Sequence, residues 1–547
     1  MKTLKDTYRS ILKWGDVEHE ETIDETMLNL LQKTFALSAA QFTEPYLPGN
    51  SPVKVDESPK LSSADIEALQ HLVGPENVNS DDYSRAYHAY GKTYLDLIKL
   101  RLEIVDNPPD VVVYPRNEAD IVAIVTWADQ NKISLTPFGG HSSVTRGLEC
   151  PRGGISLDLT RHLNQVLSVN RINSSVTVQA GMYGPAFEKY LNNYKDGYTC
   201  GHFPQSFEFS TVGGWVVTRG AGQQSTSYGK IEDMVLSIRL VSPVGIVETR
   251  DYPAASIGPD IGHLIMGSEG TYGIITAVTL KIRKYAPDQN RYFSFICKDF
   301  ESAVRIMRET MQGQFGFPSM FRLSDHEETD FAFKLKGAEG SMSDHFLKLL
   351  GYQPLKRCLL YVSTVGDPDH GKLIQKKISR LARKNGAFPL GATPALKWLE
   401  QRFSSAYLRD PLMDAGIMVD TLETAATWEN LPKVWQNVRA VIKARESAVA
   451  MVHISHVYEN GANLYFVFMT PMVKGKEIAD YCQYQNDIIT AIHENGGSLS
   501  HHHGIGRMLG PWMEKEIGET GLNILKMLKK HFDPNQIMNP GGTLGLD

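Results

Sequence analysis

Apolar residues follow a helical spacing in the first part of the chain. In "TIDETMLNLLQKTFAL", residues 22–37, they recur every three or four positions behind a threonine and an aspartate, and the later "SADIEALQHLVG" ends on a glycine. A polar cap before the first apolar residue and a glycine after the last are typical of helix boundaries. Residues up to about 100 are therefore predicted to form helices, with a Pro- and Ser-rich loop between these two. They would pack over the next domain or form a dimer contact.

The pattern then changes to strands that alternate with helices. "PPDVVVYPRNEADIVAIVTWADQNKISL" predicts strand, helix and strand with Asn117 as the helix cap, and "SVTVQAGMYGPAFEKYL" predicts a strand, a glycine turn and a helix. Three later stretches, "RYFSFICKDFESAVRIMRETMQ", "PLKRCLLYVSTVGDPDHGKLIQKKISRLARKNGA" and "NLYFVFMTPM" followed by "EIADYCQYQNDIITAIHENGG", each predict a strand and then a helix. Sheets with helices on one face indicate an α+β protein.

Length and composition add limits to this picture. A chain of 547 residues exceeds one typical core and predicts two or three domains. A formal net charge of -6 gives no general attraction to nucleic acid or to an anionic membrane, so no nucleic-acid partner is expected. The five cysteines are scattered without CxxC spacing, which predicts reduced thiols, no disulfide framework and no zinc site.

The ends of the chain carry no recognisable address. "MKTLKDTYRSILKWGD" has charges every few residues and no apolar core, unlike a signal peptide or anchor, and "TLGLD" lacks a peroxisomal signal of the SKL kind. No apolar run approaches the roughly 18 to 20 residues of a spanning helix. We therefore expect a cytoplasmic protein, with at most peripheral contact with a membrane.

Three loops rich in glycine and hydroxyl residues, each attached to a predicted strand, carry the first sign of chemistry. Without a Cβ, backbone amides can approach a phosphate closely. Three such loops suit a long diphosphate cofactor better than three ordinary hairpin turns, which is the other interpretation. The candidate cofactor-binding residues are Pro137, Phe138, Gly139, Gly140, His141, Ser142 and Ser143 in the first loop; Gln205, Ser206, Ser210, Thr211, Gly213, Gly214, Thr218, Arg219, Gly220 and Ala221 in the second; and Gly267, Ser268, Glu269, Gly270, Thr271 and Ile274 in the third.

At these loops the chain resembles the FAD-binding domain of the vanillyl-alcohol oxidase type, and no GxGxxG fingerprint of a Rossmann domain appears. Within that superfamily, "FEFSTVGGW", "YGKIED" and "GGSLSHHHGIG" resemble the alkyldihydroxyacetonephosphate synthase family, also called alkylglycerone-phosphate synthases, from about residue 82 onward. The resemblance implies bound FAD in a PCMH-type domain and a cap domain of antiparallel sheet covered by helices. The expected regions are 1–105 (helical), 106–284 (FAD-binding), 285–500 (substrate-binding cap) and 501–547 (a C-terminal segment that returns to the flavin).

The resemblance also implies roles for residues of the cap. Arg322 in "PSMFRLSDHEE" and Tyr465 in "ENGANLYFVF" are expected to be catalytic, and Arg409 in "SSAYLRDPLMD" to bind the substrate phosphate. A guanidinium can hold a phosphate in a bidentate pair, and a phenol can relay a proton if its pKa is lowered. The alternatives are a surface ion pair for Arg409 and a core position for Tyr465.

His501, His502 and His503 are the remaining catalytic candidates. By resemblance they lie beside the flavin and take part in proton transfer, for which imidazole suits because its ordinary pKa is near neutrality. Adjacent side chains on a strand or helix point in different directions, so at most two of the three could converge on one metal ion. No metal site is therefore expected; a structural role is the other alternative.

His141 departs from the family, whose loop resembles "PIGGGTS". Other members of the superfamily carry Gly-Gly-His here and bond the imidazole to the flavin. One hypothesis is an 8α-histidyl bond from His141 to FAD; the other is a hydrogen bond to a phosphate or a neighbouring loop.

The reaction that the resemblance implies replaces the acyl chain of acyl-dihydroxyacetone phosphate by a long-chain fatty alcohol, without net redox change. Lipid substrates, peripheral membrane contact and a homodimer follow as expectations, and "FKLKGAEGSMSDHFLKLLGYQPLK" is a candidate mobile gate or a solvated loop. The alternative is an FAD-dependent oxidase or dehydrogenase of a 2-hydroxy acid or other alcohol. Against it, "ENGANLYF" stands where that class carries a "GDGNLH"-like metal motif. A binding module without catalysis is disfavoured because all three loops are intact.

Overall fold

The computed structural model describes residues 5–19 and 21–547, so the first four residues of the predicted N-terminal region lie outside it. The N-terminal helices begin at polar caps. Asp24 accepts a hydrogen bond from the amide of Met27 at 2.8 Å and so caps α2, while Thr93 and Asp96 form a capping box on α5. The elements of this region are α1 (Tyr8–Leu12), α2 (Glu25–Phe35), α3 (Ser63–Val73), β1 (Val78–Asn79), α4 (Asp82–Tyr87) and α5 (Tyr94–Arg101).

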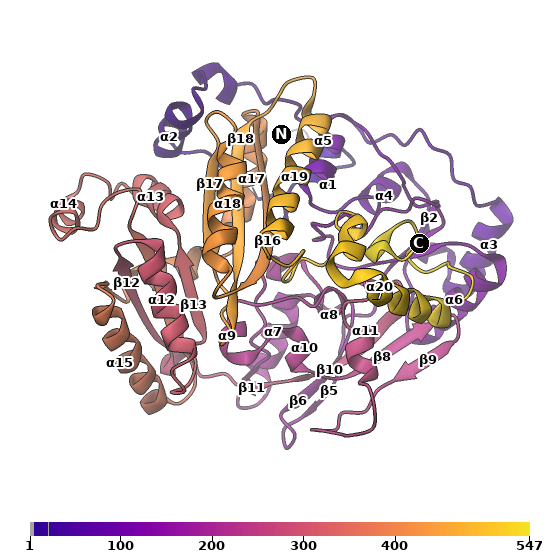
Figure 1. Ribbon diagram of the computed structural model, residues 1–547. Helices are drawn as coiled ribbons and strands as arrows, with labels where there is room; N and C mark the ends of the chain where they lie inside the picture. The colour runs from indigo at the N-terminus through magenta and orange to yellow at the C-terminus, as the bar shows by residue number, and fades with distance from the viewer. Residues whose placement is uncertain (1–4, 20) are drawn as a thin grey trace.

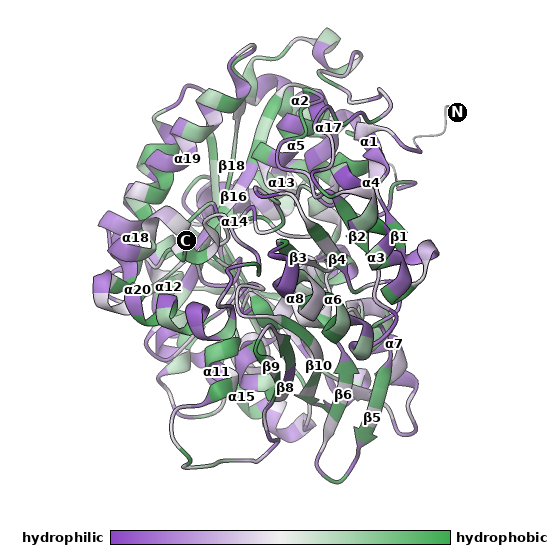
Figure 2. Cartoon of the chain, turned by 90° about the vertical axis from the view of Figure 1, so that its right-hand side faces the viewer, coloured by the Kyte–Doolittle hydropathy of each residue, from purple (hydrophilic) through white to green (hydrophobic). Residues whose placement is uncertain are grey.

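This region covers two domains rather than one. α3 packs on α6 of the flavin-binding half, whereas α2 buries Met27, Leu31 and Phe35 against the end of the cap sheet. In Figure 2, α1, α2, α4 and α5 gather at the top of the molecule and β5, β6, β8 and β10 lie at the bottom.

The next part of the chain contains two larger sheets and a two-stranded antiparallel sheet of β7 and β11. The first is mixed, in the order β1-β2-β4-β3, and the second is antiparallel, in the order β5-β6-β10-β8-β9. Their elements are β2 (Val111–Val113), α6 (Glu118–Asn131), β3 (Leu135–Phe138), β4 (Ile155–Asp158), β5 (Val166–Asn170), β6 (Ser175–Gln179), α7 (Gly184–Asn193), β7 (Tyr198–Thr199), α8 (Val212–Val217), α9 (Ser225–Tyr228), α10 (Ile231–Met234), β8 (Val235–Ser242), β9 (Gly245–Glu248), α11 (Ile261–Ile265), β10 (Ile274–Lys281) and β11 (Arg283–Lys284).

The cap is one antiparallel sheet of seven strands, in the order β15-β12-β14-β13-β17-β18-β16. Its helices α12, α15, α18 and α19 lie along one face (Figure 1). The elements are β12 (Arg291–Cys297), α12 (Phe300–Met311), β13 (Met320–Ser324), α13 (His326–Leu335), α14 (Met342–Leu349), β14 (Cys358–Thr364), α15 (Pro368–Lys384), β15 (Phe388–Gly391), α16 (Thr393–Gln401), α17 (Arg409–Asp414), β16 (Ile417–Thr427), α18 (Leu431–Lys443), β17 (Val449–Ile454), β18 (Gly461–Pro471) and α19 (Glu477–Glu494).

Side chains of β18 alternate between the helix-covered face of the cap sheet, which forms its core, and the opposite face. Leu464, Phe466 and Phe468 are fully buried under the helices, and the residues between them point to the opposite face. This opposite face lies toward the flavin-binding half.

The chain ends by returning to the first sheet. After α20 (Met513–Phe532), Leu135 of β3 donates its amide to Ile537 at 2.8 Å, and Asn539 donates to Leu135 at 2.8 Å. None of the helices that the structure describes is both long and apolar enough to cross a bilayer.

Candidate active site

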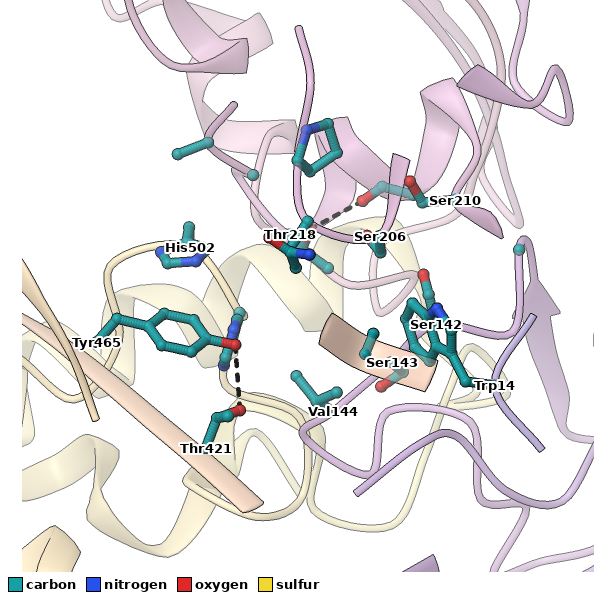
Figure 3. Close-up of a pocket in the computed structure, with 18 of the residues that line it drawn as sticks. Trp14, Ser142, Ser143, Val144, Ser206, Ser210, Thr218, Thr421, Tyr465 and His502 are labelled. Carbon is teal, nitrogen blue, oxygen red and sulfur yellow. Dashed lines mark hydrogen bonds between the residues drawn. The ribbon is translucent and has the colours of Figure 1, made fainter. Parts of the chain in front are cut away.

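A cavity of about 630 Å³ lies between the flavin-binding half and the free face of the cap sheet. Most residues proposed from the sequence line it, although they come from segments far apart in the chain. Those in its wall are Pro137, Phe138, Gly139, Gly140, His141, Ser142, Ser143, Gln205, Ser206, Ser210, Thr211, Gly213, Gly214, Thr218, Gly220, Ala221, Glu269, Gly270, Ile274, Arg322, Arg409, Tyr465, His502 and His503. Figure 3 shows Ser142, Ser143, Ser206 and Thr218 across the cavity from Tyr465.

The three glycine loops form one wall because they pack directly on one another. A Cβ on Gly140 would lie 2.3 Å from the backbone oxygen of Phe209, and one on Gly270 would lie 2.8 Å from the ring of Pro137. Neither neighbour can give way without moving its loop, and Gly270 also has a φ of +77°. Glycine is therefore required where the loops meet.

Four of the predicted cofactor residues do not line the cavity. The Arg219 side chain forms an ion pair with Glu232, with Nη2 at 3.3 Å from Oε1. Because Glu232 is not in the cavity wall, this ion pair holds the guanidinium outside the cavity. Thr271 donates to the oxygen of Ser268 at 2.7 Å, which closes the third loop, and Gly267 donates its amide to Val216 at 3.2 Å. These residues, with Ser268, therefore stabilise the conformation of the loops without lining the cavity.

Gln223 was missed by the sequence interpretation. It lies in the cavity wall, and both its Oε1 and Nε2 are buried without a hydrogen-bond partner in the protein. A buried carboxamide left unpaired costs free energy, so a ligand with a donor and an acceptor is expected to satisfy it. Together with the hydroxyls and glycine amides of the loops, this wall fits FAD, whose diphosphate and isoalloxazine edge offer such groups. The chain binds FAD.

Opposite this wall, one row of polar residues crosses four strands of the cap sheet. Ser324 of β13 pairs with His453 of β17, His453 pairs with Tyr465 of β18, and Tyr465 pairs with Glu423 of β16. Directly opposed residues share a sheet face, so the four side chains form a polar band facing the flavin wall. His453, in the apolar run "AMVHISHV", was not singled out from the sequence.

Tyr465 is the centre of this band. Its hydroxyl donates to Thr421 Oγ1 at 3.2 Å (Figure 3), and its ring stacks on His453 with a centroid distance of 4.6 Å. Burial raises the pKa of Tyr465 to about 12. From the sequence, this phenol is expected to relay a proton only if its pKa is lowered, and the pKa is instead raised. The phenol is therefore protonated at neutral pH and is a proton donor.

Glu423 holds the histidine triplet in place. Its Oε1 accepts hydrogen bonds from the amides of His501, His502 and His503, each at 3.0 Å, and from Ser500 Oγ at 2.6 Å. Burial alone would raise the pKa of Glu423, but the neighbouring His502 and His503 hold it well below its usual value. The ionised carboxylate thus fixes the irregular backbone of the triplet.

The three histidines are not equivalent. His501 does not line the cavity, because its Nδ1 faces His502 at 2.9 Å and its Nε2 faces the Tyr458 hydroxyl at 2.5 Å. His502 and His503 do line it. Burial lowers the pKa of His503 to about 4 and that of His501 well below its ordinary value, so both rings are neutral and able to accept a proton.

His456, in the loop after β17, lines the cavity and brings a third imidazole to the triplet. Ring nitrogens of His456, His501 and His502 lie within 4.8 Å of one another, a spacing that could hold a metal ion. Two members of the triplet converge at this point, in agreement with the argument that no more than two of them could face one metal ion. The third possible ligand, His456, comes from the loop after β17.

The two candidate arginines have different surroundings. Arg322 lines the cavity and donates to Glu328 Oε1 at 2.7 Å, and its Nε is buried without a partner. Arg409 donates to the backbone oxygen of Lys92 at 2.6 Å and leaves its Nε buried without a partner. It lines the cavity and is not a surface ion pair with Asp410, so it retains donors for an anion.

Beyond the polar band, the cavity continues over an apolar surface. The next row on the sheet pairs Met451 and Thr421 with Val467, and the one after it pairs Val449 and Val419 with Met469. Apolar residues from α2, α13, α17 and the preceding loop complete this end of the cavity: Met27, Phe331, Leu335, Leu408 and Leu412. The cavity therefore has a polar end and an apolar end.

His141 lies in the cavity wall with a φ of +59°. Its ring packs on Tyr87 at 4.1 Å between centroids, and its Nε2 has no partner. Burial, with Lys92 and His88 nearby, keeps the pKa of His141 well below its usual value. A neutral, unpartnered nitrogen is compatible with either hypothesis for this residue, and the covalent bond stays a prediction.

Two family models match successive parts of the chain. Residues 109–250 match the family described as FAD binding domain, and residues 286–543 match FAD linked oxidases, C-terminal domain.

The chain is 33% identical over 526 residues to an alkyldihydroxyacetonephosphate synthase of Dictyostelium discoideum, which covers 90% of this chain and 85% of that protein. It is 31% identical over 452 residues to an uncharacterized FAD-linked oxidoreductase of Escherichia coli, covering 79% of this chain and 88% of that protein. A solved alkyldihydroxyacetonephosphate synthase superposes with a TM-score of 0.83 at 29% identity, covering 97% of this chain and 99% of the other.

Proposed function

We propose an activity for this chain from one premise: the chain belongs to the alkyldihydroxyacetonephosphate synthase family. The activity is FAD-dependent ether-lipid synthesis, in which the acyl chain of acyl-dihydroxyacetone phosphate is exchanged for a long-chain fatty alcohol. The observation that carries it is a single cavity whose flavin wall faces a polar band that continues into an apolar surface. An amphiphilic substrate with a reacting carbon between a phosphate and a long chain fits this order of surfaces.

Each end of such a substrate has a counterpart in the cavity. The alkyl chain fits along Met451, Val467 and Met469, where it replaces water on apolar side chains. The phosphate fits the unpaired donors of Arg409, and Arg322 is held by Glu328 at the edge of the polar band. The ester carbon then lies between the polar band and the flavin wall.

When bound, FAD supplies an electron-poor ring that can hold the reacting carbon while its substituent is exchanged. The chain's own residues manage the protons. Neutral His503 is able to take the proton from the carbon beside the carbonyl, and the protonated phenol of Tyr465 is able to return one. Glu423 stabilises the triplet whenever one of its rings becomes charged.

Peripheral membrane contact through α14 is part of the proposal. Met342 and Leu349 on one face of this helix are 91% and 86% exposed, and Phe346 lies between them on that face, while Asp344 and Leu347 on the other face are buried. α13, which precedes α14, lines the apolar end of the cavity. An apolar helix face next to that end would deliver lipid substrates from a bilayer. The same stretch is the candidate gate.

A homodimer in the cytoplasm completes the proposal. The family resemblance supports the dimer, and a measured mass of twice one chain by light scattering would establish it. A mass of one chain would overturn it.

The proposed activity is tested by turnover of purified flavoprotein with palmitoyl-dihydroxyacetone phosphate and hexadecanol in air. Ether product with flavin that stays oxidised at steady state would establish the synthase. If no ether forms and the flavin instead bleaches with a 2-hydroxy acid or alcohol and recovers with oxygen or an added acceptor, the chain is an oxidoreductase.

A further inference from the structure

A glutamate and a histidine in the cavity wall have no part in proton transfer in the account above. Glu328 lies in the first turn of α13 and His453 is the last residue but one of β17, and the two meet because β13 and β17 are neighbours in the sheet. His453 Nδ1 lies 3.0 Å from Glu328 Oε2, while Glu328 Oε1 accepts from Arg322 at 2.7 Å and from Ser324 Oγ at 2.9 Å. The carboxylate therefore has a partner for each oxygen.

These contacts determine which nitrogen of His453 carries the proton. Burial alone would raise the pKa of Glu328, but the neighbouring His453 and Arg322 hold it well below its usual value, so the carboxylate is ionised. An ionised carboxylate only accepts hydrogen bonds, so Nδ1 carries hydrogen. Burial and Arg322 lower the pKa of His453, which leaves the ring neutral and Nε2 with a free lone pair. An imidazole oriented by a carboxylate in this way is a general base.

The position of His453 on the sheet indicates what it would meet. On its own strand, the next residue of the same face is Met451, which belongs to the apolar row with Val467. On the neighbouring strand its partner is Tyr465. A chain that lies along these rows passes the Thr421 hydroxyl, which already accepts a hydrogen bond from Tyr465, and then reaches His453 and Tyr465. The terminal hydroxyl of a fatty alcohol would therefore end beside these two rings.

We propose that His453, oriented by Glu328, is the catalytic base that removes the hydroxyl proton of the incoming fatty alcohol. This inference rests on the proposed function. As the alcohol oxygen bonds to the carbon that the carboxylate has left, its O–H bond breaks and the proton passes to Nε2. The resulting imidazolium is stabilised by Glu328 and then gives its proton to the departing fatty acid carboxylate or to water. One C–O bond forms and one breaks, and no electrons are gained or lost.

The test separates the alcohol step from the acyl step. In His453→Gln, we expect ether formation from hexadecanol to fall by about 10² to 10⁴, the range for a lost general base. Exchange of labelled palmitate into palmitoyl-dihydroxyacetone phosphate should continue near the wild-type rate, because a carboxylate brings no proton to remove. With 2,2-difluorohexadecanol, whose hydroxyl is more acidic, the deficit in ether formation should shrink.

Two further variants control the result. His493→Gln removes a histidine of α19 whose Nδ1 lies 3.4 Å from Glu516 of α20, and should leave both rates unchanged because neither residue lines the cavity. Glu328→Gln should also lose ether formation selectively, but to a smaller degree than His453→Gln. If His453→Gln does not fold with bound flavin, the Glu328→Gln variant tests the proposal instead. Equal loss of exchange and ether formation, or the same deficit with both alcohols, would overturn the proposal. Absence of ether from the wild type would instead overturn the proposed function.

Discussion

Burial determines the protonation of the individual groups in the site. The buried rings of His453 and His503 are neutral, the phenol of Tyr465 is protonated, and Glu328 and Glu423 remain ionised because each has several donors. The cavity therefore holds proton acceptors and a proton donor at the same pH. Acid–base exchange without net redox chemistry needs this combination.

Removing the phenol of Tyr465 should abolish most of the activity without disturbing the fold. The one hydrogen bond that the structure gives this hydroxyl is to Thr421, so Tyr465→Phe loses little stability. We expect kcat for ether formation to fall by about 10² to 10⁴ with unchanged flavin content. Tyr484→Phe, which removes a buried hydroxyl bonded to Ile442 on the far face of the cap, is the matched control. Full activity in Tyr465→Phe would contradict the role.

Replacing Glu423 should destabilise the protein in a pH-dependent way. The folded-state pKa of Glu423 lies below its unfolded value, so its carboxylate stabilises the fold above about pH 4.3 and this stabilisation is lost as pH falls through the folded pKa. Glu423→Gln should cost about 2 to 4 kcal/mol at pH 7, because a carboxamide turns an N–H toward the amides of the triplet. Urea titrations should show the difference from wild type shrinking below about pH 4. A constant difference would show that the charge is not responsible.

The covalent hypothesis for His141 is decided by the colour of precipitated protein. A bond to the flavin predicts a yellow pellet after acid precipitation, and His141→Ala should release all colour into the supernatant. A colourless pellet from the wild type would leave His141 as a residue that packs on Tyr87 and hydrogen-bonds its surroundings.

At the scale of elements, the site is a product of strand register. The polar band consists of residues from β13, β17, β18 and β16 that share one cross-strand row, and a shift of one residue in any of these strands would send its side chain to the helix-covered face. The helix α14 is placed differently. One of its faces is buried against the protein, and its other face is exposed to solvent.

The exposed face of α14 should govern binding to lipid surfaces. The double variant Met342→Ser, Leu349→Ser should bind phosphatidylcholine vesicles at least about tenfold more weakly in cosedimentation, because it lacks two large apolar side chains that would insert into the bilayer. Turnover of detergent-dispersed substrate should be unchanged. Ile172→Ser, at an exposed residue between β5 and β6, is the control. Undiminished vesicle binding by the double variant would exclude α14 as the contact.

At the scale of the whole molecule, ion pairs join the N-terminal region to the cap. Asp414 at the end of α17 accepts from Arg9 and from Arg101, both at 2.6 Å, and the side chain of Arg101 is completely buried. Through this aspartate, α1 and α5 of the N-terminal region are fixed to α17 of the cap.

Asp414→Asn should therefore loosen the whole assembly. It leaves the buried charge of Arg101 without its anion, which we expect to cost about 3 to 5 kcal/mol of the free energy of unfolding. Chemical denaturation at fixed FAD concentration measures the loss. Asp56→Asn, which breaks an exposed pair with Lys54, should have no measurable effect. Equal stability of the two variants would show that Asp414 does not join the regions.

The sequence by itself determined the class of protein and pointed to most of the residues that line the cavity. The glycine and hydroxyl loops, the α+β pattern, the FAD-binding and synthase motifs and the residues Tyr465, Arg322 and Arg409 are local features. Each loop needs particular residues where it bends or approaches a neighbour, and those requirements are visible in the order of amino acids.

Only the tertiary structure decided which side chains act together. His453, Glu328 and Glu423 are unremarkable in their own segments. Antiparallel pairing places His453 opposite Ser324, and Glu328, in the helix that follows Ser324, then lies within 3.0 Å of His453. Long-range packing also brings the rings of His456, His501 and His502 within 4.8 Å of one another. Charge partners and burial, which set protonation, depend on these long-range contacts, and no local pattern encodes them.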